Sequence, residues 1–130
     1  MKHQELRERT KNFALRIIRM YGALLRSTEA QVLGKQVLRS GTSVAANYRE
    51  ASRARSDAEL LSKLGLVEQE LDETLLWLEL LVEAGIVPAA KMSKLQQEAD
   101  ELLRITATAI KTTKNRNICS WNAQFFLAFP

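Results

Sequence analysis

Apolar residues recur along most of the chain at steps of three, four and seven positions, the spacing of one face of an α-helix. In the first part of the chain this spacing predicts a helix over about residues 4–26. Its apolar positions are Leu6, Phe13, Ile17, Tyr21 and Leu24. The most regular stripe predicts a helix over 57–84, with apolar positions Leu60, Leu64, Val67, Leu71, Leu75 (or Thr74), Leu78 and Val82.

Two further helices are expected on either side of that stripe. A helix over about 29–55 would begin after Ser27 or Thr28, either of which can accept hydrogen bonds from the first free amides. Asp57, preceded by Ser56, is the expected cap of the helix over 57–84, and Gly85 follows its last periodic residue. The fourth helix is expected over 88–114, with apolar positions Leu95, Ala99, Leu102, Thr106, Ala109 and Ile110.

Four helices joined by short links favour an all-α fold, an up-down-up-down antiparallel four-helix bundle. We place this bundle at residues 1–116 and treat 117–130 as a hydrophobic C-terminal segment. The chain of 130 residues suits a single domain, and its seven Gly and Pro residues are too few for a sheet with many turns.

The stretch RSGTSVAANYREASRARSDA, residues 39–58, holds an unusual number of small residues for a helix. Gly41 alone costs ~1 kcal/mol relative to Ala in a helix interior. We therefore expect Gly34, Gly41 and their small neighbours to let this helix approach another closely. Tyr48 would add apolar contact, and Asn47 would hydrogen-bond across a packed interface and set its register.

Charge is segregated along the chain, although the net charge is only +4. Residues 1–26 carry +5, residues 27–56 carry +3, residues 57–87 carry −7, and residues 88–130 carry +3. The acidic third helix therefore lies among basic neighbours. This pattern either fixes the assembly of helices and subunits or leaves basic surface for a polyanion, and the sequence does not choose between the two.

The basic residues of the first two helices are the candidates for nucleic-acid binding. Arg49 and Arg53 are four residues apart and so share a helix face, with Arg55 near the helix end and Arg39 ten residues earlier. Guanidinium groups can bind phosphates in bidentate fashion, without any base contact. The first helix carries a second basic strip of Arg9, Arg16 and Arg19 together with Lys2, Arg7 and Lys11.

No arrangement in the sequence supports catalysis or a cofactor. With one histidine, His3, expected outside the bundle, and one cysteine, Cys119, no His/Cys metal site or nucleophile with its base is expected. The acidic residues of the third helix are spread around its axis and would not converge on a metal ion. We expect no enzyme, no metal and no cofactor.

Apolar residues beyond one core stripe suggest contact between subunits. Trp77 lies among leucines in the third helix, and Trp121, Phe125 and Phe126 lie in the C-terminal segment. We expect these residues to pack on the same bundle or on a second subunit. No segment has the length and apolarity of a membrane span, so a cytoplasmic protein is expected.

Two motifs resemble a known family. SGTSVAANYREASRARSDAE and LGLVEQELDETLLWLELLVEAG are similar to the small bacterial four-helix proteins encoded in intervening sequences of 23S rRNA genes. The resemblance implies a ring-shaped homo-oligomer, commonly a homopentamer, with no known catalytic activity. A related branch assists the reverse transcriptases of diversity-generating retroelements by binding nucleic acid and the enzyme through basic surfaces. Our leading hypothesis is a homo-oligomer that binds RNA, DNA or a nucleoprotein partner; the alternative is a protein-only scaffold.

Overall fold

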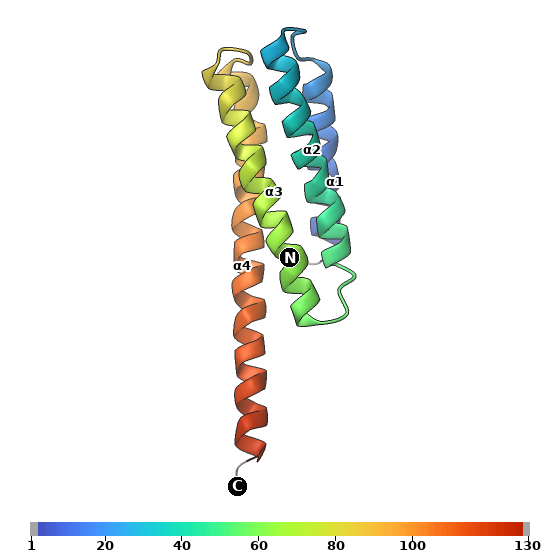
Figure 1. The fold of residues 1–130 in the computed structure, drawn as a ribbon, viewed down its shortest axis with the longest axis vertical. Coiled ribbons are helices and arrows are strands. Elements are labelled where there is room, and N and C mark those ends of the chain that lie inside the picture. Colours follow the sequence, from blue (N-terminus) through green and yellow to red (C-terminus); the bar gives the residue numbers. More distant parts are fainter. Residues whose placement is uncertain (1–2, 129–130) are drawn as a thin grey trace.

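The chain folds into four α-helices with no strand among residues 3–128, the residues that this computed structural model describes; side chains are described for 3–116. The helices are α1 (His3–Gly22), α2 (Thr28–Ala51), α3 (Asp57–Glu83) and α4 (Ala89–Ala128). They run alternately up and down, as expected for an antiparallel bundle (Figure 1). α2 packs extensively against α3, α1 packs against α2 and α4 against α3, whereas α1 and α4 make few contacts.

Local chemistry determines most helix ends. The Ser27 hydroxyl accepts a hydrogen bond from the Ala30 amide at 3.3 Å, and α2 begins there as expected. At α3 the cap is Ser56, which accepts from the Glu59 amide, and not Asp57, which is the first helical residue. Ser56 has an extended backbone, which directs its hydroxyl oxygen toward the amide three residues later. Ser56 is therefore the N-cap of α3, and Asp57 is not. Gly85 has a φ of +76°, a conformation that glycine adopts without strain.

Three helix ends differ from the expected ones. α1 ends at Gly22 instead of 26, because the chain there changes to tighter turns such as the bond from the Leu24 amide to the Tyr21 carbonyl. α2 ends at Ala51 instead of 55, where the Ser52 hydroxyl competes for the Arg49 carbonyl. α4 continues to Ala128 instead of 114, since residues 89–129 contain no Gly or Pro to interrupt it.

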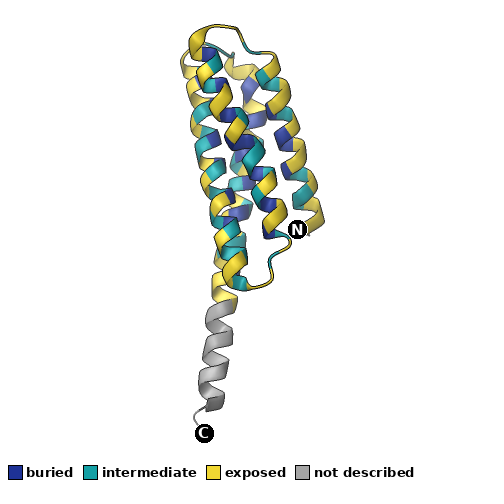
Figure 2. Cartoon of the chain, turned by 45° about the vertical axis from the view of Figure 1, so that its right-hand side comes forward, coloured by how far each residue is buried: buried dark blue, intermediate teal, exposed yellow. Residues whose placement is uncertain are grey.

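The core lies between the four helices, and the buried faces all point inward (Figure 2). Most expected core positions are buried, including Phe13, Ile17 and Leu71 at 0% exposure. Of the two alternatives that the periodicity left open in α3, Thr74 is buried and Leu75 is only partly buried. Thr74 is accommodated because its hydroxyl hydrogen-bonds Ser40 of α2 and the Glu70 carbonyl, both at 2.7 Å.

Two glycines bring α2 close to α1, which accounts for the small residues of α2. A Cβ atom on Gly41 would lie 2.8 Å from Cγ1 of Ile17 and 3.1 Å from its Cγ2. A Cβ atom on Gly34 would meet Leu24 and Tyr21 at 2.6 and 2.9 Å. These distances are shorter than normal carbon contacts. At Gly41 the obstacle is the inner part of the Ile17 side chain, so a larger residue there would push α1 and α2 apart; at Gly34 the nearest atom is the end of the Leu24 side chain, which would have to turn aside.

Replacing Gly41 with Ala is expected to lower the free energy of unfolding by about 1–2 kcal/mol. Overpacking costs about 1–3 kcal/mol, which exceeds the ~1 kcal/mol by which Ala favours a helix over Gly. Gly65→Ala is the matched control, because nothing lies within 4 Å of its added Cβ. The control is expected to gain about 0.5–1 kcal/mol. Urea denaturation followed by circular dichroism, at one protein concentration, measures both; an equal effect of the two substitutions would contradict the close approach.

Candidate nucleic-acid interface

A basic groove runs along the seam between α1 and α2. The hollow has a volume of about 480 Å³ and is lined by Arg7 and Lys11 of α1, by Arg49 of α2 and by Arg53, which lies just after the end of α2. Ala45, Ala46 and Glu50 complete the lining. We call this set of seven residues the basic groove. Arg7 and Lys11 are four residues apart in α1 and share one face of it. Arg49 and Arg53 were expected to share a helix face, but α2 ends at Ala51, so Arg53 lies in the turn after the helix and reaches the hollow from there.

The four cations of the basic groove have no carboxylate partner within 4.0 Å among the side chains that the structure describes. The single acid in the lining, Glu50, instead pairs with Lys63 of α3 at 2.6 Å. Four positive side chains that line one hollow produce a positive electrostatic potential inside it. The basic groove therefore has the charge of an anion-binding site.

The basic groove extends toward the beginning of α1. A smaller hollow of about 380 Å³ shares Arg7 and Arg49 with it and reaches His3, Gln4 and Ser52. Glu8 also lines this extension. Positive charge is consequently strongest in the basic groove itself and weaker beside His3.

The sequence-predicted cations do not form one surface. Arg49 and Arg53 lie in the basic groove, where Arg7 and Lys11 join them. Arg16, Arg19 and Arg55 do not line it. Arg7 and Lys11 are four residues apart in the sequence, as are Arg49 and Arg53. This equal spacing is the only feature of the sequence that hinted at a common location for the four residues.

Arg9 and Arg39 are engaged in ion pairs between helices. Arg9 binds Glu98 and Glu101 of α4, and these bonds raise its pKa above the ordinary value. Arg39 binds Glu73 at 2.8 Å and Glu70 at 3.3 Å in α3, and its pKa is likewise raised. These two residues therefore stabilise the packing of neighbouring helices, and phosphate binding would have to compete with carboxylates already in place.

The expected packing residues have different environments. Gly41 is buried against α1, as described above, and Tyr48 is buried at 3% exposure. Asn47 donates its side-chain hydrogen bond to the Ser43 carbonyl of its own helix at 3.0 Å, not to a neighbouring helix as expected. The side chain of a helical Asn can reach the carbonyl one turn earlier in its own helix, and this local partner competes with one across the interface. Trp77 is partly buried, and its indole Nε1 is buried without a hydrogen-bond partner among the side chains of residues 3–116.

The C-terminal aromatic residues lie outside the described side chains, so their expected packing stays a prediction. They are Trp121, Phe125 and Phe126. Within residues 3–128, no helix is both long and apolar enough to cross a membrane. The described residues likewise include no group of three His, Cys, Asp or Glu side chains that could hold a metal ion.

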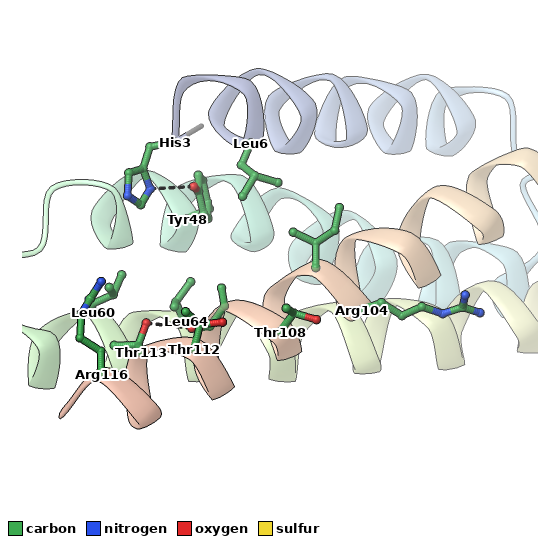
Figure 3. Close-up of a pocket in the computed structure, with 12 residues that line it drawn as sticks. His3, Leu6, Tyr48, Leu60, Leu64, Arg104, Thr108, Thr112, Thr113 and Arg116 are labelled. Atoms are coloured by element: carbon green, nitrogen blue, oxygen red, sulfur yellow. Dashed lines mark hydrogen bonds between the residues drawn. The ribbon is translucent and has the colours of Figure 1, made fainter. Parts of the chain in front are cut away.

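His3 lies on the bundle and not outside it, contrary to the sequence expectation. Its Nδ1 is 3.0 Å from the hydroxyl of Tyr48, although 45 residues separate the two in the chain (Figure 3). The first turn of α1 places the imidazole over the end of α2, which the short-range sequence pattern does not reveal. Burial raises the pKa of Tyr48 to about 12, against a smaller opposing effect of Arg7. The phenol thus stays protonated and can donate to His3.

The raised pKa of Tyr48 predicts a loss of stability in alkali. The unfolded chain releases the phenol proton near pH 10, whereas the folded chain retains it to about 12. The contribution is therefore complete below pH 10 and falls by about 2–3 kcal/mol as the pH rises to 12. Tyr48→Phe removes the titrating group and leaves all others. Parallel unfolding free energies of the wild type and Tyr48→Phe across this range would refute the prediction.

Comparison with known proteins shows where this bundle belongs. No curated protein matches the chain. A solved structure from the S23 ribosomal protein family, a protein of unknown function from Bacteroides thetaiotaomicron, is 34% identical with a TM-score of 0.79. The match covers 85% of this chain and 99% of that one. The family model for 23S rRNA-intervening sequence proteins matches residues 2–108, which include all cations of the basic groove. The chain belongs to the 23S rRNA-intervening sequence protein family.

Proposed function

We propose that this protein is a non-enzymatic nucleic-acid-binding protein whose basic groove holds the phosphate backbone of structured RNA or DNA. The observation that carries this proposal is that four cations, from α1, from α2 and from the turn after α2, line one hollow without carboxylate partners among the described residues. Arg9 and Arg39 differ from these four cations, because each forms an ion pair with an acidic residue of a neighbouring helix, α4 for Arg9 and α3 for Arg39.

The floor of the basic groove suits a backbone ligand. Ala45 and Ala46 have small side chains, so a phosphate can enter between Arg49 and Arg53 on one side and the cations of α1 on the other. Each bound phosphate releases condensed counterions, which supplies affinity without any base contact. Because the lining contains no aromatic residue for stacking, the groove would position nucleic acid without reading its sequence.

Salt dependence tests the proposal. Fluorescence anisotropy of a labelled RNA hairpin and a labelled DNA duplex, titrated at several salt concentrations, gives the slope of log K against log salt. Four phosphate contacts predict a slope of about −3 to −4, at roughly −0.9 per phosphate. The absence of binding at low salt would overturn the proposed function.

Matched variants locate the binding site. Arg49→Gln/Arg53→Gln is expected to reduce the magnitude of the slope by about 2 and the affinity by about 10- to 100-fold. Lys91→Gln/Lys94→Gln removes the same charge from exposed positions of α4 and is expected to change neither. Ala46→Leu fills the groove at an exposed position without changing the charge, and it is expected to weaken binding several-fold. Equal losses in the α2 and α4 double variants would indicate general charge attraction.

A second proposal concerns assembly, because α3 exposes apolar residues. Leu76 is 47% exposed and Leu80 is 36% exposed. They are one helical turn apart and follow each other on one face of α3. We propose that this face joins copies of the chain into a homo-oligomer, of which the ring of five implied by the family resemblance is one form. A protein-only scaffold remains the alternative function if nucleic acid does not bind.

Charge on the assembly face tests this second proposal. Leu76→Lys/Leu80→Lys is expected to reduce the mass measured by light scattering to that of one chain, 14.7 kDa, because two ammonium groups would have to be desolvated in the interface. Leu25→Lys, at a residue that is 61% exposed between α1 and α2, is the control. A double variant that keeps the wild-type mass would place the interface elsewhere.

A further inference from the structure

A second hollow lies at the end of the bundle where α1 begins. It has a volume of about 560 Å³ and opens between α1, α3 and α4 (Figure 3). We call it the end pocket and define it by His3, Tyr48, Leu64, Ile105, Thr108 and Thr112. Pockets for small organic groups usually measure roughly 300–1,000 Å³. The end pocket is therefore large enough for an aromatic ring.

The end pocket exists because α1 and α4 are loosely packed. These helices make few contacts, and Arg9 with Glu98 and Glu101 supplies their main polar link. At the opposite wall, Arg116 of α4 binds Asp57 of α3 at 2.7 Å and holds those two helices together. The hollow is thus bounded by ion pairs on both sides while its centre stays open.

The lining of the end pocket combines apolar walls with hydroxyl groups. Leu64 and Ile105 provide apolar surface from α3 and α4. The hydroxyls of Thr108 and Thr112 make no hydrogen bond with the described part of the chain, whereas Thr113 bonds the Ala109 carbonyl at 2.8 Å. Figure 3 shows Thr108 and Thr112 on the wall that α4 contributes. Two hydrogen-bonding groups are accordingly available to a ligand.

The charge of the lining excludes one class of ligand and favours another. None of the residues that line the end pocket is acidic, so a cationic ligand would find no counter-charge in the lining. The lining also contains two arginines, Arg104 and Arg116, and each of them is already paired with an aspartate outside the lining. The hydroxyls and the Tyr48 phenol, which stays neutral, suit an uncharged group with donors and acceptors along its edge. A nucleobase has two apolar faces and such an edge, and proteins hold extruded bases between apolar side chains in this way.

The end pocket is continuous with the basic groove. His3 lines both the end pocket and the extension of the basic groove, and that extension shares Arg7 and Arg49 with the groove. A path of shared residues therefore leads from the four cations, around the first turn of α1, into the end pocket. A strand whose phosphates occupy the basic groove can reach the end pocket with its next nucleotides.

From this continuity we infer that the end pocket takes an unpaired nucleobase, and that the ligand of this protein is nucleic acid with a single-stranded end or bulge. The inference rests on the proposed function, since the basic groove must first hold the strand. A base inside a duplex presents its edge to its partner, so only an unpaired base can enter.

Two matched ligands test the inference in the wild-type protein. One is a blunt-ended RNA hairpin. The other is the same hairpin with a short unpaired extension, placed at the 5′ end in one RNA and at the 3′ end in another. The extended hairpin is expected to bind about tenfold more tightly, the effect of enclosing one base. A fluorescent adenine analogue in the extension is expected to change its emission on binding, because the base leaves water.

Variants of α4 separate the end pocket from the basic groove. Thr112→Trp fills the pocket from an exposed position and is expected to reduce the affinity for the extended hairpin to that for the blunt one. Ala107→Trp places the same side chain at an exposed α4 position outside the lining and is expected to have no effect. Thr108→Val/Thr112→Val keeps the shape but removes both hydroxyls, and it is expected to lose several-fold in affinity for the extended hairpin only.

The binding experiments test the proposed function and the inference about the end pocket separately. If the blunt and extended hairpins bind wild-type protein equally, or Thr112→Trp keeps the preference, the inference is overturned while the proposed function stands. Two results together support a site made of the basic groove and the end pocket. Arg49→Gln/Arg53→Gln lowers the affinity for both hairpins, and Thr112→Trp leaves the affinity for the blunt hairpin unchanged. If neither hairpin binds the wild type, the proposed function and the inference both fail.

Discussion

The structure depends on the close approach of α1 and α2, which is possible only because α2 presents glycine to α1. Gly41 leaves no room for a methyl group beside Ile17, and Gly34 leaves none beside Tyr21 and Leu24. α2 is a weak helix by propensity, so its stability comes from this packing and from α3 on its other side. The same approach brings Arg7 and Lys11 level with Arg49 and Arg53 across one seam. Helix packing and the candidate ligand site therefore have one cause.

The cations include two groups in the structure: some form ion pairs between helices, and others line the basic groove. Arg9, Arg39 and Arg116 meet acidic residues of other helices and help to orient the bundle. Such pairs contribute little individually at a wet surface, yet wrong pairings would cost more than correct ones gain. The cations of the basic groove lie on the seam of α1 and α2, and none of them pairs with a carboxylate of α3 among the described residues. Their charge is therefore available to the polyanion proposed as the ligand.

The end pocket gives the bundle an asymmetry that a regular four-helix bundle lacks. Three of the four seams are well packed, while the fourth, between α1 and α4, is open. His3 and Tyr48 form its rim, and their hydrogen bond joins the first turn of α1 to the last turns of α2. A bundle that needed only stability would have closed this seam with apolar side chains. Its open form, continuous with a basic surface, is the arrangement that a binding site requires.

Helical periodicity by itself determined the number and order of the helices, most of the core, the α2 cap at Ser27 and the break at Gly85, because these follow from interactions between near neighbours in the chain. It did not determine the position of Arg53, which was expected on a helix face with Arg49 but lies in the turn after α2. Only the tertiary structure decided which cations are neutralised, that Arg7 and Lys11 join Arg49 and Arg53, and that His3 reaches Tyr48. The burial of Thr74 in place of Leu75 was also decided by the tertiary structure. These features depend on the rotation and register of one helix against another, which packing between distant residues sets.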